Sequence, residues 1–449
     1  MTSPQRLALG IAVLASLVTF LDGAIINVAL PAMVRDLGGG LKLQQWVVDA
    51  YLVTLGSLML AAGSLSDVFG RKRILRLGLL GFGATSLLCA VAPTGAVLVL
   101  ARALQGATGA LLVPGSLALI LSFFSGPAQA KAIGAWTGWT GGAFIAGPLV
   151  GGLLVDTVGW RWIFAINVLP IGLTLALLAR MEDPARPEGA RVDVLGAVLA
   201  CVGLGGPVYA LIEQGTVGWT HPTVLVSLGV GVPAFLAFLW QERRSPHPMM
   251  PLGLFRARNF WVGNLATTFI YGALALSEFL ITLFLQQVGG FRATLAGLSL
   301  LPTTILMLLL SSTFGGLAGR FGPRLFMAVG PCVAGAGFLL MLRVGTPLDF
   351  WRQMLPGVLV FGLGLTTTVA PLTAAVLGSV HKAQAGIGSA INNAIARVAG
   401  LIAIAFAGLI VGPRLDVAGF HRAMLVSAVL LVLGGVTSAL GIRNPPRDA

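Results

Sequence analysis

The chain has 449 residues, of which 57% are hydrophobic and 10% are charged, and its formal net charge is +13. Soluble globular proteins have about 25% charged residues, so this composition excludes that class and predicts a protein that resides in a lipid bilayer. A large positive charge is also typical of proteins that bind nucleic acids. In a membrane protein, basic residues instead gather in the cytoplasmic loops, so their positions along the chain show which explanation holds.

Fourteen mainly apolar runs are long enough to cross a membrane as helices, because a helical span needs about 20 such residues. They lie at 7–31, 44–66, 75–93, 96–123, 129–155, 161–180, 193–214, 223–241, 261–287, 293–319, 325–343, 353–379, 384–412 and 423–442. We therefore predict an all-α polytopic membrane protein with fourteen transmembrane helices. The first run is too long for the apolar region of a signal peptide, so we expect it to remain as a span.

The lysines and arginines are distributed unevenly between the two sides of the membrane. With the N-terminus placed in the cytoplasm, most of the 28 fall in cytoplasmic loops, and Arg102 and Arg397 lie within spans. This follows the positive-inside rule and predicts that both termini are cytoplasmic. The positive charge therefore indicates membrane topology, and we expect no nucleic-acid partner. The excess of arginine over lysine, with abundant alanine and glycine, is typical of a GC-rich bacterial genome. We therefore expect the protein in a bacterial inner (plasma) membrane.

One sequence repeat is visible, because GSLSDVFGRK at 63–72 recurs as GGLAGRFGPR at 315–324. Each copy ends a span and opens a basic loop, and the copies are eight spans apart. This spacing predicts two six-helix bundles, at 1–180 and 260–449, and a connector at 181–259 that contributes an inserted two-helix hairpin. Repeated halves are typical of alternating-access transporters.

Several further motifs occur in a fixed order along the chain. They are LDGAIINVALP (21–31), GSLSDVFGRK (63–72), LARALQGATGA (100–110), AFIAGPLVGG (143–152), WRWIFAINVLP (160–170) and PMMPLGLFRARNF (248–260). In order and spacing they resemble the 14-helix drug:proton antiporter family of the major facilitator superfamily. The resemblance implies a major facilitator fold and proton-coupled drug efflux. Ala24, Ala143 and Gly319 depart from the pattern of that family.

The loop motif at 63–72 is a candidate gate. Asp67 lies near the C-terminal end of its helix, where the helix dipole disfavours a negative charge, so it needs a partner. Arg71 is a local candidate, and the N-terminus of the span at 325–343 is a second. The resemblance implies that such a bridge holds one conformation closed, and a solvated loop ion pair is the alternative. The predicted gating residues are Gly63, Asp67, Gly70, Arg71 and Lys72.

The fifth span (129–155) carries glycines at roughly four-residue intervals, which permit close contact between helices. Pro148 should kink this span. The resemblance implies that its second half is the motif associated with antiport, and plain helix packing is a compatible explanation. The predicted antiporter motif consists of Gly142, Gly147, Pro148, Gly151 and Gly152.

The charged residues inside spans are candidates for proton coupling, because a charge at the bilayer centre costs at least about 2.5 to 3.5 kcal/mol. Asp22 and Arg102 are expected to adjoin the same cavity and to pair. A conformational change that separates them would let Asp22 carry a proton, and a fixed ion pair is the alternative. Asp49 lies near a span end, so an interfacial role is equally open. The predicted proton-coupling residues are Asp22, Arg102, Glu278 and Asp49.

Polar residues spaced along the span at 261–287 share one helix face. A face with a carboxylate, a phenol and hydroxyls suits a cavity wall that attracts a lipophilic cation. A set of hydrogen-bonded polar residues between helices is the alternative. The predicted substrate contacts are Asp22, Asn27, Thr267, Tyr271, Glu278, Thr282, Asn392 and Asn393.

Nothing in the sequence indicates an enzyme, because it contains neither a GxxxxGK[ST] loop nor a catalytic or metal-ligand cluster. The three cysteines lie in apolar runs, which favours lone buried thiols. We expect no metal and no cofactor, with the proton gradient as the energy source.

The predicted function is proton-coupled export of lipophilic, cationic drugs by alternating access. The alternative is a dedicated exporter of an endogenous antibiotic, metabolite or lipid, and a sensor without transport activity is a third hypothesis. The expected partners are small lipophilic drugs, protons and membrane lipids, and we expect the protein to act as a monomer.

Overall fold

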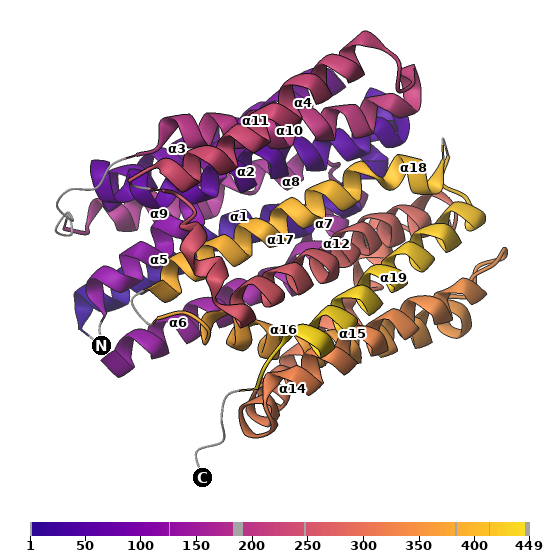
Figure 1. Ribbon diagram of the computed structural model, residues 1–449. Coiled ribbons are helices and arrows are strands. Elements are labelled where there is room, and N and C mark those ends of the chain that lie inside the picture. Colours follow the sequence, from indigo (N-terminus) through magenta and orange to yellow (C-terminus); the bar gives the residue numbers. More distant parts are fainter. Residues whose placement is uncertain are drawn as a thin grey trace. The chain divides into compact units, whose positions relative to one another are not determined.

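The structure is a computed structural model that describes residues 2–124, 126–182, 192–246, 248–381, 384–412 and 414–444. These residues form helices and no strand, which confirms the all-α fold class (Figure 1). The chain divides into two compact units. Unit 1 comprises Met1–Met249 with Arg292–Thr294, and unit 2 comprises Met250–Phe291 with Leu295–Ala449.

The helices of the first 249 residues are α1 (Ser3–Leu37), α2 (Gly40–Phe69), α3 (Arg71–Ala90), α4 (Gly95–Gly109), α5 (Leu112–Phe123), α6 (Gly126–Gly141), α7 (Ala143–Thr157), α8 (Trp162–Ala165), α9 (Val168–Ala179), α10 (Val194–Val217) and α11 (Pro222–Arg244). The later helices are α12 (Arg258–Gln287), α13 (Ala293–Leu298), α14 (Leu301–Phe321), α15 (Pro323–Leu340), α16 (Leu355–Leu377), α17 (Ala385–Ala405), α18 (Ala407–Val411) and α19 (Val417–Gly441). There are also three short helical turns. The turn η1 (Leu252–Arg256) precedes α12, η2 (Met341–Arg343) follows α15, and η3 (Phe350–Met354) precedes α16.

Among the described residues, thirteen helical stretches are long and apolar enough to cross a membrane. The 30-residue helix α2 is not one of the thirteen, but it covers the remaining predicted run at 44–66. Some of its side chains are not described. The helices therefore occupy all fourteen predicted apolar runs. The division into two bundles and a hairpin remains a prediction; α10 and α11 fall in unit 1.

Three of the spans are interrupted near a proline. The breaks between α4 and α5, between α8 and α9, and between α13 and α14 lie a few residues before Pro114, Pro170 and Pro302. A proline lacks the backbone N–H that would close the preceding turn, and its ring clashes with the carbonyl four residues earlier. The fifth span differs, because its break lies at Gly142 and Pro148 lies inside α7.

The two copies of the sequence repeat have the same backbone geometry. Gly70 joins α2 to α3 with φ 92°, and Gly322 joins α14 to α15 with φ 87°. Both values lie in the left-handed region, which glycine adopts without the steric cost that a Cβ would add. The repeat therefore encodes the same tight turn in each unit.

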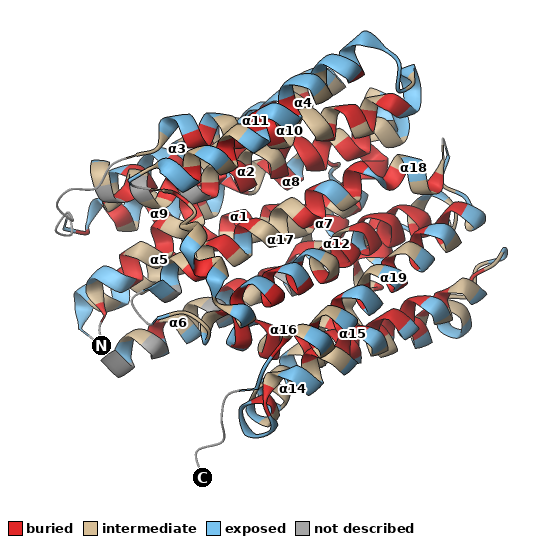
Figure 2. Ribbon diagram, in the orientation of Figure 1, coloured by how far each residue is buried: buried red, intermediate tan, exposed pale blue. Residues whose placement is uncertain are grey.

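Within unit 1, α1 packs against α5 and α7, and α2 packs against α4 and α10. Within unit 2, α15 packs between α16 and α19, and α12 contacts α17 and α19. Figure 2 shows buried residues concentrated along α1 and α12 and exposed residues along α11 and α14. Many exposed side chains are large and apolar, such as Leu169 and Leu440. Such surfaces suit lipid tails, which are as apolar as leucine.

Candidate functional site

A buried ion pair lies at the centre of unit 1. The Nη1 atom of Arg102 on α4 is 2.6 Å from Oδ2 of Asp22 on α1. Arg102 is 0% exposed and Asp22 is 3% exposed. Hydrogen bonds between charged groups are stronger than neutral ones, and they gain further in a low-dielectric interior. The ion pair therefore links two helices that are 80 residues apart in the chain.

Amide and hydroxyl side chains extend the ion pair into a network. Gln105, one turn after Arg102, donates from Nε2 to Oδ1 of Asp22 (3.2 Å) and to Oγ of Ser86 (2.8 Å). Its Oε1 accepts from Nη1 of Arg102 at 2.7 Å. Asn167, just before α9, donates to the same oxygen of Asp22 (3.4 Å) and to Ser86 (3.3 Å). The Asp22 carboxylate thus accepts from three side chains.

Arg102 also has contacts that do not depend on Asp22. Its Nε donates to the backbone oxygen of Val47 on α2 at 3.0 Å. Its guanidinium carbon lies 4.2 Å from the ring centroid of Tyr51 and 5.8 Å from that of Phe164. Arginine above an aromatic face is attracted by the ring quadrupole. Gln105 adds a further acceptor, so the guanidinium is held from α2, α4 and α8.

Two atoms of this network make no hydrogen bond to any part of the chain that the structure describes, namely Nη2 of Arg102 and Oδ1 of Asn167. Buried polar atoms are nearly always paired with protein or ordered water. A donor and an acceptor left over in one network are suited to bind a water molecule.

Asp49 on α2 has different surroundings from Asp22. It is 0% exposed, and neither carboxylate oxygen has a hydrogen-bond partner within the described ranges. Asp49 is therefore packed inside the protein, and its depth in the membrane stays a prediction. Asn27 on α1 is half-buried, and its Oδ1 likewise lacks a partner among the described residues.

In unit 2 the candidate acid is accessible. Glu278 on α12 is exposed and Tyr271, two turns earlier, is half-buried. Arg397 on α17 lies within electrostatic range of both. Within the described part of the chain, the Glu278 carboxylate makes no direct hydrogen bond or ion pair. The carboxyl group of Glu278 therefore has hydrogen-bonding capacity left for a bound solute.

Other predicted contacts lie in helix packing or on the exposed surface. Asn392 on α17 donates to Oδ1 of Asn264 (3.0 Å) and Oγ1 of Thr267 (2.9 Å) on α12. Thr267 and Thr282 are buried, and Asn393 is exposed and bonds to Ser389 of its own helix. Thr267, Tyr271, Glu278 and Thr282 therefore differ in exposure. Thr267 and Asn392 fit the alternative of hydrogen-bonded polar residues between helices.

The gating motif is partly described. The side chain of Asp67 is outside the described residues, so its predicted bridge stays a prediction. Arg71 donates to the backbone oxygen of Ala118 (3.2 Å) and to Ser122, both on α5. Lys72 donates to the backbone oxygen of Met181. Gly63 lies in α2, and a Cβ there would meet no described atom within 4 Å.

In the antiporter motif, only part of the glycine series makes close contacts. A Cβ at Gly147 would lie 2.6 Å from that of Ala24, and one at Gly151 would lie 2.8 Å from Cγ2 of Ile25. Both contacts join α7 to α1, the helix that carries Asp22. A Cβ at Gly134 or Gly138 would meet no described atom within 4 Å. Gly142 joins α6 to α7, and Gly152 is buried in α7.

The cysteines and other potential ligands form no metal cluster among the described residues. All three cysteines are free thiols. The expectation that they are buried holds for Cys89, whereas Cys201 is half-buried and Cys332 is exposed.

Sequence reasoning missed several partners of Asp22 and Arg102, namely Val47, Tyr51, Ser86, Gln105, Phe164 and Asn167. One signal was available, because residues three positions apart share a helix face and Gln105 follows Arg102 at that spacing. Ser86 and Asn167 lie on other helices, where spacing gives no guide.

Two helical units with a shared loop motif, many membrane spans and charges buried within spans define a polytopic helical transporter. The chain belongs to the Major Facilitator Superfamily, whose sequence profile matches residues 12–404.

Two curated relatives show the kind of protein to which the chain is similar. It is 35% identical to the puromycin resistance protein pur8 of Streptomyces alboniger, over 87% of this chain and 78% of that protein. It is also 35% identical to the multidrug resistance protein Stp of Mycobacterium tuberculosis, over 88% of this chain and 74% of that protein.

A solved structure supports the fold. The crystal structure of an auto-inhibited POT family peptide transporter has a TM-score of 0.70 and 16% identity, and the match covers 99% of both chains. At this level of identity, the similarity shows the fold alone.

Proposed function

We propose that this chain is a proton-coupled secondary active exporter of lipophilic, cationic drugs that works by alternating access. The observation that carries the proposal is the buried Asp22–Arg102 ion pair with its surrounding donors. An ionisable pair inside a span is the usual component of a proton relay. The names of the two relatives, a puromycin resistance protein and a multidrug resistance protein, support drugs as the substrate class.

Asp22 is the proton carrier in this proposal. When it binds a proton, Arg102 loses its charged partner but keeps Val47, Gln105 and the Tyr51 ring. Removing one partner of a buried pair costs about 3 to 5 kcal/mol, and these remaining contacts offset part of that cost. One charge crossing a potential of 100 mV supplies about 2.3 kcal/mol. The proton gradient can therefore drive the opening of the pair.

Glu278 accounts for the preference for cations. Its exposed carboxylate and the Tyr271 ring lie two turns apart on the same helix, and an acid and an aromatic ring on one helix suit a lipophilic cation that reaches both. Arg397 lies within range of both residues and limits the attraction. A bound cation would compete with Arg397 for the same carboxylate.

The remaining features belong to the same proposal. The protein is a transporter without enzymatic activity, cofactor or metal, and acts as a monomer in a bacterial inner membrane. The excess of basic residues in the loops on the side of the N-terminus supports cytoplasmic termini. Its partners are small drugs, protons and the surrounding lipids.

A dedicated exporter of one endogenous product is the second candidate. One relative is named for a single compound and the other for many drugs. Because both are 35% identical to this chain, their names do not decide between a dedicated and a multidrug exporter. Substrate range in a drug-sensitive host separates the two functions. Resistance to several unrelated cationic drugs supports the first, and resistance to one compound supports the second.

Proton coupling is tested in acidified everted vesicles with a fluorescent pH indicator. Addition of ethidium to vesicles that contain the protein should release protons, whereas vesicles without it should show no release. Release with a single natural product but not with ethidium would favour the dedicated exporter. No release with any transported compound would contradict proton coupling, and no transport at all would favour a sensor.

A further inference from the structure

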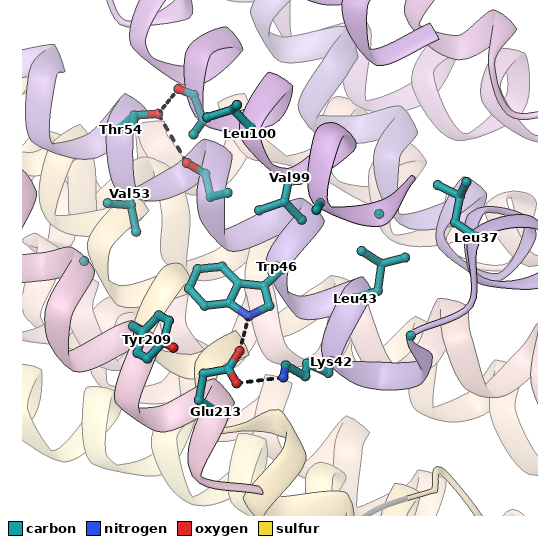
Figure 3. Close-up of a pocket in the computed structure, with 16 residues that line it drawn as sticks. Leu37, Lys42, Leu43, Trp46, Val53, Thr54, Val99, Leu100, Tyr209 and Glu213 are labelled. Atoms are coloured by element: carbon teal, nitrogen blue, oxygen red, sulfur yellow. Dashed lines mark hydrogen bonds and ion pairs between the residues drawn. The ribbon is translucent and has the colours of Figure 1, made fainter. Parts of the chain in front are cut away.

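A groove in unit 1 lies between α2, α4 and the inserted helix α10, away from the Asp22 network. Its volume is about 790 Å³. Figure 3 shows Trp46 and Val53 of α2, Val99 of α4, and Tyr209 and Glu213 of α10 around this space. Half of the lining residues are aliphatic, and three more are the glycines Gly39, Gly95 and Gly205.

The groove has one polar end. The ammonium of Lys42 lies 2.7 Å from Oε2 of Glu213, and the indole N–H of Trp46 donates to Oε1 at 3.1 Å. Both oxygens of the acid are therefore occupied. The side chain of Lys42 is 38% exposed and that of Glu213 is 13% exposed. The ammonium is thus the more exposed partner of the pair, and Figure 3 shows it beside the Glu213 carboxylate.

The other end of the groove is apolar. Its deepest polar side chain, Thr54, donates its hydroxyl to the backbone oxygen of Ala103 at 2.7 Å, so it offers no free donor. Lys42 and Thr54 are twelve residues apart in α2, which at 1.5 Å per residue is about 18 Å. One leaflet of a hydrocarbon core of about 30 Å has a depth of about 15 Å. The groove is therefore as deep as one leaflet.

We propose that this groove binds a phospholipid, with one acyl chain along Leu43, Val53 and Val99 and the phosphate at Lys42. A lysine ammonium donates charge-assisted hydrogen bonds to phosphate oxygens. A lipophilic cation fits less well, because both oxygens of Glu213 already have donors and the ammonium of Lys42 is the more exposed partner of the pair. The bound chain fills the space between α10 and the helices α2 and α4, and so stabilises the junction of the inserted helix. This role does not depend on export.

The test uses the full-length chain, purified in mild detergent and analysed by native mass spectrometry. Phosphatidylglycerol and phosphatidylethanolamine are added at equal concentration, and ethidium is added in a parallel sample. Ala103→Trp fills the groove. Leu104→Trp is the matched control, because Leu104 is the next residue on α4, is 46% exposed and does not line the groove. Ala96→Trp repeats the filling at an exposed lining position, in case Ala103→Trp misfolds.

The intact chain and Leu104→Trp should retain one phospholipid that both filling variants lose. Lys42→Gln should retain it about fivefold more weakly, the contribution of one basic residue near a membrane surface, and Lys42→Arg should restore retention. If both lipids bind, Lys42 recognises the phosphate group that they share. If only phosphatidylglycerol binds, Lys42 recognises the net negative charge of the headgroup. Equal retention by the filling variants overturns the proposal, and so does ethidium displacing the lipid from the intact chain.

Discussion

Asp22 and Asp49 are both buried acids of unit 1, and they lie on helices that contact each other, yet their surroundings are opposite. The carboxylate of Asp22 accepts from Arg102, Gln105 and Asn167. Asp49 accepts from none of the described residues. A group that exchanges a proton during a transport cycle needs an environment that accommodates both its charged and its neutral form.

The two environments differ in this respect. The donors around Asp22 compensate its negative charge, and Arg102 keeps other partners when that charge is removed. Asp49 has no compensating group, and burial of an unpaired charge is strongly unfavourable. The comparison therefore favours Asp22 over Asp49 as the proton carrier that we propose. The hydrogen-bond partners of a buried acid therefore indicate its role in proton exchange better than its position within a span does.

The largest effect on stability is expected when Arg102 is removed. Arg102→Met leaves Asp22 buried without its charged partner, which should lower the free energy of unfolding by about 3 to 5 kcal/mol. Thermal unfolding of the purified protein measures the change. The double variant Asp22→Asn/Arg102→Met removes both charges and should regain part of the loss. If the double variant is no more stable than Arg102→Met, the two residues are not coupled as described.

A smaller loss is expected from the amide that connects the network. Gln105→Leu removes a donor to Asp22 and Ser86 and an acceptor for Arg102. Leaving such buried groups unpaired costs about 1 to 3 kcal/mol. Gln105→Glu is the informative companion, because it keeps the acceptor for Arg102 and puts a second carboxyl beside Asp22. A Gln105→Leu protein as stable as the intact one would mean that the network does not stabilise the fold.

Glu278 extends the comparison to unit 2, because it is exposed and makes no direct hydrogen bond to the described residues. Glu278→Gln should weaken transport of a monovalent cation about fivefold, since an exposed ion pair contributes at most about 1 kcal/mol. Transport of a neutral drug of similar size should not change. The measurement is the apparent KM for each substrate in vesicles. If transport of both substrates weakens equally, Glu278 supports the fold and does not attract the cation.

The smallest effect is expected at Asp49. Asp49→Asn conserves the shape of a neutral carboxyl and breaks no hydrogen bond to the described residues, so stability should change by less than about 1 kcal/mol, the typical effect of a single substitution. Thermal unfolding again provides the measurement. A large gain in stability would show that Asp49 is charged in the intact protein, which contradicts the comparison.

The fold was largely predictable, because apolar runs and the positions of basic residues reflect constraints that the bilayer imposes on any sequence. Proline positions also explain three of the helix breaks. The site was predictable only in part. Asp22 and Arg102 were identifiable because charges inside spans are rare. Ser86 and Asn167 are ordinary polar residues on separate helices, and only their convergence in space makes them partners. The burial of Thr267 and Thr282 likewise depends on which helices pack against them, and the spacing of residues along one helix does not predict this.

The most direct test of the account compares Asp22→Asn with Asp49→Asn in everted vesicles. Both changes replace an acid by its neutral amide in a buried position of unit 1. The account predicts that ethidium-driven proton release is lost in Asp22→Asn and persists in Asp49→Asn, with both proteins present at the level of the intact chain. Release that survives Asp22→Asn and is lost in Asp49→Asn would contradict it.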